Sequence, residues 1–153
     1  MIKYVNYDIV CQEFPYEITL AINCSLCPNS CPGCHSPQLA GDIGEELTLP
    51  RLYGLVSDLQ GAITCVALMG GDNDPKQVER LLKEIKDLTH LRTGWYSGKA
   101  ELPEGIDLSA FNYIKLGPYQ AECGPLNKET TNQRFYKVEG NRIFDMTSLF
   151  WKK

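Results

Sequence analysis

The sequence predicts an α/β protein in which parallel strands form an open, partial (β/α) barrel. Strands and helices are expected to alternate along residues 16–116, and a loop rich in cysteine or glycine follows each of the first two strands. Strands joined by helical crossovers pair in parallel, and functional loops collect at their carboxyl ends. The 153 residues allow one domain, residues 1–153, and are too few for the eight repeats of a closed barrel.

The first predicted strand covers residues 16–22, where Ile18, Leu20 and Ile22 share one face. Thr48 can cap a helix whose apolar residues recur at helical spacing. The remaining elements are a buried strand over 63–68, a helix that begins at Asp74-Pro75 with Val78, Leu81, Leu82, Ile85 and Leu88 on its apolar face, strands over 91–96 and 113–116, and a hairpin over 134–144 that turns at Glu139-Gly140-Asn141.

Composition and charge limit the possible functions. Apolar residues make up 43% and charged residues 22% of the chain, which is ordinary for a globular protein. The formal net charge of −4 and the lack of a basic run argue against a nucleic-acid partner, because such binding depends on clustered Lys and Arg. No apolar stretch is long enough to cross a bilayer, and the first residues form no signal-peptide pattern. A cytoplasmic protein with no membrane partner is therefore expected.

Four of the seven cysteines fall within eleven residues: Cys24, Cys27, Cys31 and Cys34. A high, odd count without an export signal favours metal binding over a disulfide framework. The last three have the spacing C-x3-C-x2-C, and three thiolates of one tight loop can hold three irons of a 4Fe-4S cluster, which leaves the fourth iron open. A four-cysteine zinc site and a ferredoxin-type cluster remain alternatives, although both usually have other spacings. The other three cysteines are scattered and are assigned no role: Cys11, Cys65 and Cys123.

The same loop resembles the signature of a known superfamily. C-x3-C-x2-C is typical of radical S-adenosylmethionine (radical SAM) enzymes, and the run CPGCHSP at residues 31–37 is similar to the form in activating enzymes of anaerobic ribonucleotide reductase. The resemblance implies a barrel of the radical SAM type, with S-adenosylmethionine as second cofactor and Cys27, Cys31 and Cys34 as cluster ligands. Cys24 is expected to be structural, since a fourth ligand would block the open iron.

A glycine-rich turn, Gly70-Gly71-Asp72, follows the buried strand over 63–68. An ordinary turn in which an aspartate caps the next helix would also explain it. Beside the cysteine loop, however, it resembles the GGE-type motif of the superfamily, which contacts the amino group of the methionine moiety. Gly70, Gly71 and Asp72 are therefore candidate cofactor-binding residues, and Ser97, at the end of another strand, is a fourth. No catalytic residue beyond the cluster ligands is predicted.

The resemblance extends from about residue 16 to 138 and includes GPY at 117–119 and TTNQR at 130–134. It implies reductive cleavage of S-adenosylmethionine to a 5′-deoxyadenosyl radical, which generates a glycyl radical on the large anaerobic ribonucleotide reductase. A reduced flavodoxin-type or other low-potential protein would donate the electron. An activase of a different glycyl-radical enzyme and a non-catalytic iron-sulfur or zinc docking module remain alternatives. The roles of Asn132, Gln133 and Arg134 are not predicted.

Overall fold

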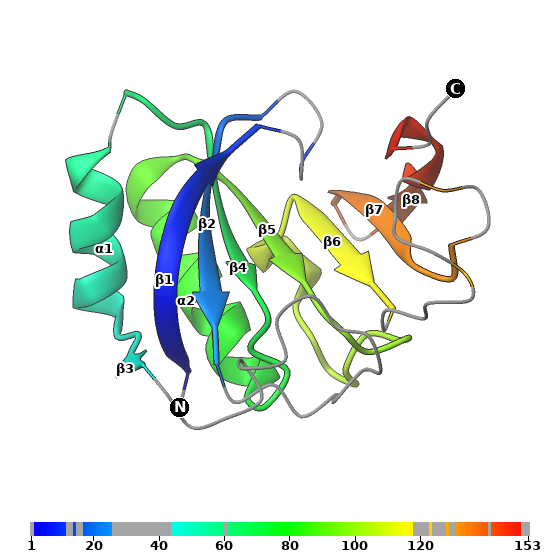
Figure 1. Ribbon diagram of the computed structural model, residues 1–153, viewed down its shortest axis with the longest axis horizontal. Helices are drawn as coiled ribbons and strands as arrows, with labels where there is room; N and C mark the ends of the chain where they lie inside the picture. Colours follow the sequence, from blue (N-terminus) through cyan, green and yellow to red (C-terminus); the bar gives the residue numbers. More distant parts are fainter. Residues whose placement is uncertain are drawn as a thin grey trace.

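One mixed sheet with two α-helices makes up most of the described chain (Figure 1). The computed structural model describes residues 2–11, 14, 17–25, 44–59, 61–117, 123, 128, 131–140 and 142–150. Its strands are β1 (Lys3–Val10), β2 (Thr19–Cys24), β3 (Glu45–Glu46), β4 (Cys65–Met69), β5 (Arg92–Tyr96), β6 (Tyr113–Leu116), β7 (Arg134–Glu139) and β8 (Arg142–Asp145). Its helices are α1 (Leu49–Asp58), α2 (Pro75–Thr89) and the short 3-10 helices η2 (Leu108–Ala110) and η3 (Thr147–Phe150).

The middle of the sheet is parallel and both flanks are antiparallel. The order of the described strands is β3-β1-β2-β4-β5-β6-β7-β8. Strands β2, β4, β5 and β6 pair in parallel, whereas β1 runs antiparallel to β2 and the β7–β8 hairpin runs antiparallel to β6. The predicted α/β class, the parallel strands and the terminal hairpin are confirmed. The sheet formed by the described strands is open, as predicted, but it is mixed, because both of its flanks are antiparallel.

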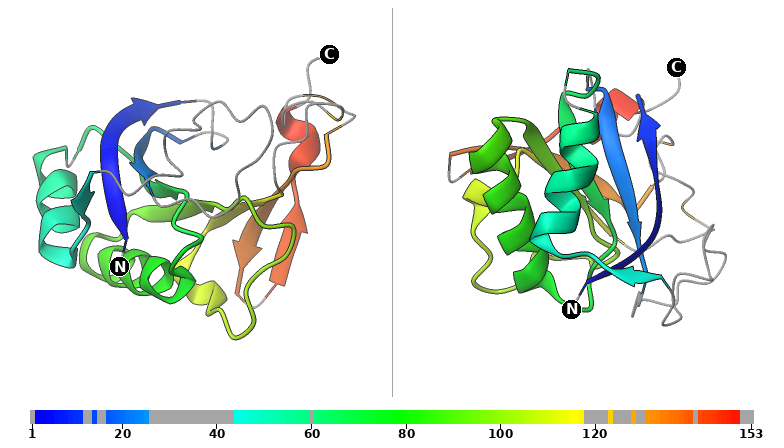
Figure 2. Two further views of the ribbon diagram at one scale, coloured as in Figure 1. Left: turned by 60° about the horizontal axis from the view of Figure 1, so that its bottom comes forward. Right: turned by 90° about the vertical axis from the view of Figure 1, so that its left-hand side faces the viewer.

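Both α-helices begin at the residues that the sequence indicates. The Thr48 hydroxyl accepts a hydrogen bond from the Arg51 amide (3.3 Å), and the Asp74 carboxylate accepts one from the Gln77 amide (3.4 Å). Figure 2 shows the two helices side by side on one face of the sheet, which confirms the predicted helical crossovers of the parallel core. The buried residues of α2 are Val78, Leu81, Leu82 and Ile85.

The main core lies between these helices and the sheet. Because successive residues of a strand point to opposite faces, Leu20, Val66, Leu68 and Trp95 all project toward the helices, where they are fully buried. A smaller apolar cluster packs on the second face of the sheet, opposite the α-helices: Phe14, Cys65, Ala67, Tyr113 and Phe135. Each face of the parallel core therefore has its own apolar packing.

Three local predictions differ from the structure. The strand predicted over 16–22 begins only at Thr19, and Ile18 precedes it with 43% of its surface exposed. Leu88 was assigned to the apolar face of the second helix but is 58% exposed, because the core contacts of α2 end at Ile85. Strand β1, which pairs along β2, was not predicted at all.

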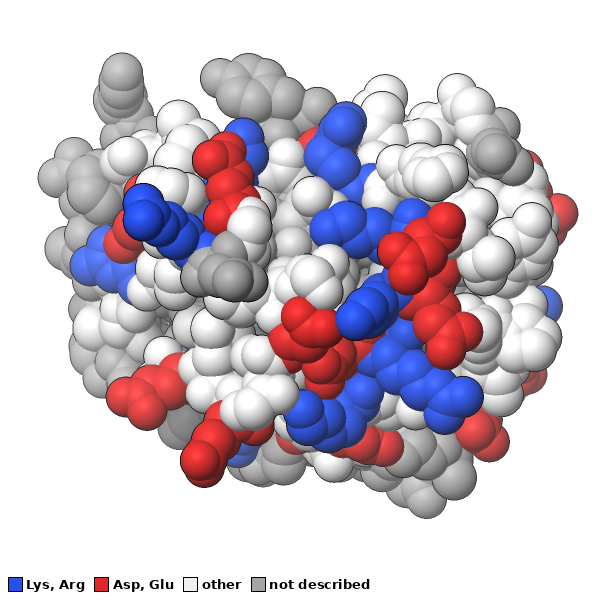
Figure 3. Space-filling view, turned by 180° about the vertical axis from the view of Figure 1, so that it is seen from behind, with Lys and Arg blue, Asp and Glu red and all other residues white. Residues whose placement is uncertain are grey.

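The surface opposite the view of Figure 1 is polar and mixed in charge. Acidic and basic side chains are interspersed over it (Figure 3). Arg80 of α2 pairs with Glu84 (3.6 Å), and Lys83 pairs with Asp107 (2.8 Å). Exposed pairs of this kind stabilise by at most about 1 kcal/mol, so they indicate a solvated surface rather than a binding site. No helix among the described residues has both the length and the apolar character needed to cross a membrane.

Candidate functional site

The predicted cofactor-binding residues gather at one edge of the sheet, where the parallel strands have their carboxyl ends. Gly70, Gly71 and Asp72 follow β4 directly, and Ser97 follows β5. Strands β4 and β5 are parallel neighbours, and their last residues, Met69 and Tyr96, lie opposite each other. Loops at this edge are the usual location of ligand sites in α/β folds. The structure thus brings the four residues together from two separate parts of the chain.

The strand that precedes the predicted cluster loop ends at the same edge. This strand, β2, lies beside β4 in parallel register, with Asn23 opposite Met69. A Cβ built on Gly70 would lie 3.4 Å from the Cβ of Cys24, the last residue of β2. The three predicted ligands lie outside the described residues: Cys27, Cys31 and Cys34. In the part of the chain that is described, no group of three His, Cys, Asp or Glu side chains is arranged to hold a metal ion.

The glycine turn has a fixed backbone. Gly70 and Gly71 have φ angles of +112° and +90°, a backbone conformation that residues with a side chain rarely adopt. The Gly70 amide donates to the Tyr96 carbonyl (2.9 Å), and the Gly70 carbonyl accepts from the Trp95 indole nitrogen (2.7 Å). A Cβ on Gly71 would lie 2.7 Å from the Val78 side chain. Packing of α2 is therefore one reason for glycine at position 71, whether or not a ligand binds there.

Asp72 and Ser97 are hydrogen-bonded to each other. The Ser97 hydroxyl donates to Asp72 Oδ1 (2.6 Å), and the Gly98 amide donates to Asp72 Oδ2 (2.8 Å). Asp72 is 8% exposed and Ser97 is fully buried. The Ser97 amide donates in turn to the Lys115 carbonyl of β6 (2.8 Å). The pair therefore connects the loop after β4 with the loop after β5 and with the next parallel strand.

Cys24 belongs to the core below this edge. Its side chain is 1% exposed, and its thiol donates weakly to the Ile22 carbonyl (3.7 Å). Burial, and then the nearby charge of Asp72, raise the pKa of Cys24 to about 12. Metal ligation requires a thiolate, so these surroundings favour a thiol with a packing role.

The end of β6 adds Lys115, which the sequence analysis did not identify, and contacts of Gly117 and Gln133, to which it gave no role. Lys115 is 8% exposed; its Nζ lies 5.2 Å from the centre of the Tyr96 ring and donates to the Gly117 carbonyl (3.4 Å). Gln133 Nε2 donates to the same carbonyl (3.3 Å), and the Gly117 amide donates to the Lys99 carbonyl (2.6 Å). A lysine is usually exposed, so the sequence alone gave no reason to expect a buried ammonium here.

Comparison with known proteins gives no match. No family model matches the sequence, and neither a curated protein nor a solved structure is significantly similar to it. The functional assignment therefore rests on the residues of this chain.

An open hollow adjoins the candidate site. Its volume is about 480 Å³, which lies within the range of small-molecule sites. It lies between the start of α2 and the loop after β5, and its lining residues are Asp72, Pro75, Lys99, Ala100, Glu101 and Pro103. The edge thus has room for a ligand beside the glycine turn.

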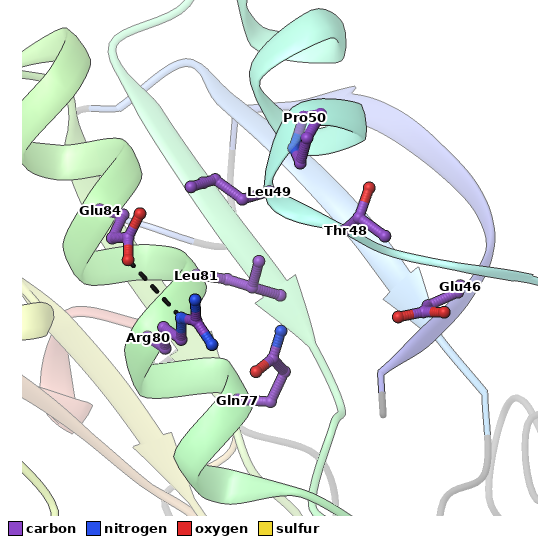
Figure 4. Close-up of a pocket in the computed structure, with 8 residues that line it drawn as sticks. All are labelled: Glu46, Thr48, Leu49, Pro50, Gln77, Arg80, Leu81 and Glu84. Atoms are coloured by element: carbon purple, nitrogen blue, oxygen red, sulfur yellow. Dashed lines mark ion pairs between the residues drawn. The ribbon is translucent and has the colours of Figure 1, made fainter.

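A second hollow lies in the helix layer, between the start of α1 and α2 (Figure 4). Its volume is about 190 Å³, and Figure 4 shows Arg80 directed toward Glu84 at its rim. Leu49, Pro50 and Leu81 supply its apolar part. Arg80 and Glu84 pair with each other, so this hollow offers fewer groups for binding a ligand than the carboxyl edge.

Alanine at Gly71 should destabilise the fold more than alanine at Gly70. Both substitutions force a side chain into a positive φ, which costs roughly 1–2 kcal/mol. Only at Gly71 does the new Cβ collide with the core, at Val78, whereas at Gly70 it makes ordinary contact with Cys24. We expect losses of about 1–2 kcal/mol for Gly70→Ala and about 2–4 kcal/mol for Gly71→Ala in urea unfolding. Equal losses would contradict the packing role of Gly71.

Proposed function

We propose that this chain is a radical SAM activating enzyme. It holds one 4Fe-4S cluster through Cys27, Cys31 and Cys34 and binds S-adenosylmethionine beside the Gly70–Asp72 turn. Its substrate is a backbone glycine of anaerobic ribonucleotide reductase. The observation that carries the proposal is the C-x3-C-x2-C spacing directly after β2, whose carboxyl end adjoins the turn after β4.

Several features of the described residues fit these cofactors. The positive φ angles of Gly70 and Gly71 form a tight turn at the carboxyl edge of the parallel strands, where α/β folds usually bind ligands. The buried ammonium of Lys115 on the second face is a suitable partner for a carboxylate such as that of the methionine moiety. The parallel core of β2, β4, β5 and β6 is compatible with the partial barrel of the superfamily.

The chemistry that the two groups supply when bound is reductive cleavage of S-adenosylmethionine to methionine and a 5′-deoxyadenosyl radical. The protein's part is orientation and exclusion of water, because such a radical would otherwise react with its surroundings. Phe14, Tyr113 and Phe135 pack with ring centres 5.6–5.8 Å apart and give the second face an apolar floor.

The decisive experiment is electron paramagnetic resonance on an anaerobic mixture of this chain, S-adenosylmethionine, a reductant and anaerobic ribonucleotide reductase. A glycyl doublet should appear on the large protein only when all four components are present. Omission of each component in turn is the control.

Other results would support the alternatives. Robust cofactor cleavage without a radical on the reductase, but with one on another glycyl-radical enzyme, would keep the superfamily and change the substrate. A bound cluster without any cleavage would favour a docking module, and zinc in its place would contradict the proposal.

A further inference from the structure

The Gly70–Gly71 turn is attached at three points to the end of β5 and to the loop that follows it. Two are the backbone groups of Gly70, which bond to Tyr96 and Trp95. The third is the Asp72 carboxylate, which receives hydrogen bonds from Ser97 and from the following amide. Hydrogen bonds to a charged carboxylate are stronger than those between neutral groups, so the third attachment contributes most per bond.

The Asp72 carboxylate is already engaged by the protein. Each of its oxygens accepts a hydrogen bond, and the residue is almost completely buried. If the carboxylate turned toward a ligand, the fully buried Ser97 hydroxyl would lose its acceptor, and so would the Gly98 amide. Leaving such groups unsatisfied is costly, so direct contact with a cofactor through this side chain is disfavoured.

We propose that Asp72 and Ser97 act together as positioning residues, which fix the Gly70–Gly71 backbone for S-adenosylmethionine and do not themselves touch it. This inference rests on the proposed function and assigns these two side chains a different role from the one predicted from the sequence. The cofactor's ammonium is received by the backbone carbonyls of the turn, because a carbonyl oxygen that already accepts one hydrogen bond has a second lone pair. The Asp72–Ser97 pair determines where that backbone lies relative to the end of β5.

Three variants show whether Asp72 and Ser97 position the turn or contact the cofactor directly. The measurement is equilibrium binding of S-adenosylmethionine to the full chain after anaerobic reconstitution. Asp72→Ala removes the acceptor of Ser97 and Gly98 and should weaken binding about 30-fold. Ser97→Ala removes one of the two bonds and should weaken it about tenfold. Asp72→Asn loses the charge, but its side chain keeps an oxygen that can accept from the Gly98 amide and gains an amide group that can donate to the Ser97 hydroxyl. Its affinity for S-adenosylmethionine should therefore stay within about fivefold of wild type.

The order of these variants decides the question. Positioning predicts that Asp72→Asn binds much better than Asp72→Ala, and that the double variant with Ser97→Ala is hardly weaker than Asp72→Ala alone. Direct pairing of the carboxylate with the cofactor's ammonium predicts equal losses for Asp72→Asn and Asp72→Ala, with Ser97→Ala like wild type. That result would overturn the inference. Asp74→Asn is the matched control, because it removes a nearby charge while an asparagine still caps α2.

Hydrogen exchange of the protein without cofactor gives a second measurement. The amides of Gly70 and Gly98 should exchange faster in Ser97→Ala than in wild type, while the amides of α2 keep their protection. Unchanged exchange at both amides would contradict the positioning role. If Asp72→Ala does not fold, Ser97→Ala and Asp72→Asn still decide the outcome. A wild-type chain that binds no S-adenosylmethionine would overturn the proposed function itself and this inference with it.

Discussion

Serine in place of Cys27, Cys31 or Cys34 should abolish the intact 4Fe-4S cluster, whereas Cys24→Ala should largely keep it. Each of the three proposed ligands holds one iron, so the loss of a single thiolate leaves that iron without a protein ligand. Iron and sulfide content per chain and the visible absorbance after anaerobic reconstitution measure the result. We expect close to one cluster in wild type and Cys24→Ala, and almost none in the three serine variants.

Cys24 differs from the proposed ligands because its thiol is packed in the core. Cys65→Ala is a matched control: this thiol is also fully buried, and burial likewise raises its pKa to about 12, but it lies at the amino end of β4. Both alanine variants should lose some stability through a small cavity and should retain the cluster. Loss of the cluster in Cys24→Ala alone would indicate ligation by four cysteines and contradict the open iron on which the proposed function depends.

The helices were predictable because their signals are local. An aspartate followed by proline, with apolar residues three and four positions apart, specifies the start and the buried face of α2 without reference to the rest of the chain. The end of the buried face was not predictable. Leu88 continues the apolar spacing, but whether it is covered depends on how far the neighbouring elements extend.

Strand β1 was missed, although its apolar residues alternate with polar ones as in a half-buried strand. Val5, Tyr7 and Ile9 alternate with polar residues, yet all three are more than a third exposed. The strand forms instead by antiparallel pairing with β2, in which Tyr7 lies opposite Ile22. Pairing of this kind depends on partner strands, here β2 and β3, and the sequence of the strand alone specifies it weakly.

The candidate site was predictable as a set of residues but not as a set of contacts. Gly70 and Asp72 were identified because their turn follows a strand and resembles the GGE-type motif, and Ser97 because it lies at the end of another strand. The bond between Asp72 and Ser97 depends on the parallel register of β4 and β5, two strands that are separated in sequence by the whole of α2. The burial of Lys115 depends likewise on the register of β6 beside β5. Long-range register of this kind is not encoded in local residue patterns.

Glu17→Gln should destabilise the fold by about 2–3 kcal/mol near neutral pH. Glu17 lies at the amino ends of the parallel strands, opposite the candidate site, and is 4% exposed. Its carboxylate accepts hydrogen bonds from Thr64 (2.6 Å), Tyr113 (2.6 Å) and the Arg92 guanidinium. Glutamine cannot accept all three and brings its own donors into the site, so partners are left unsatisfied. Urea unfolding at pH 7 measures the loss, and the exposed Glu84→Gln is the control, with an expected loss below about 1 kcal/mol.

The same carboxylate predicts how stability depends on pH. Burial alone would raise the pKa of Glu17, but the hydrogen bonds from Arg92, Thr64 and Tyr113 outweigh it and hold the pKa below its ordinary value of 4.5. A group whose pKa is lowered by folding stabilises the folded state above its unfolded pKa, and that contribution is lost as the pH falls through the folded pKa. The stability difference between wild type and Glu17→Gln should therefore be largest above pH 5 and should shrink steadily below about pH 4.5. A difference that stays constant down to pH 3 would contradict a charged Glu17 as the source of this stability.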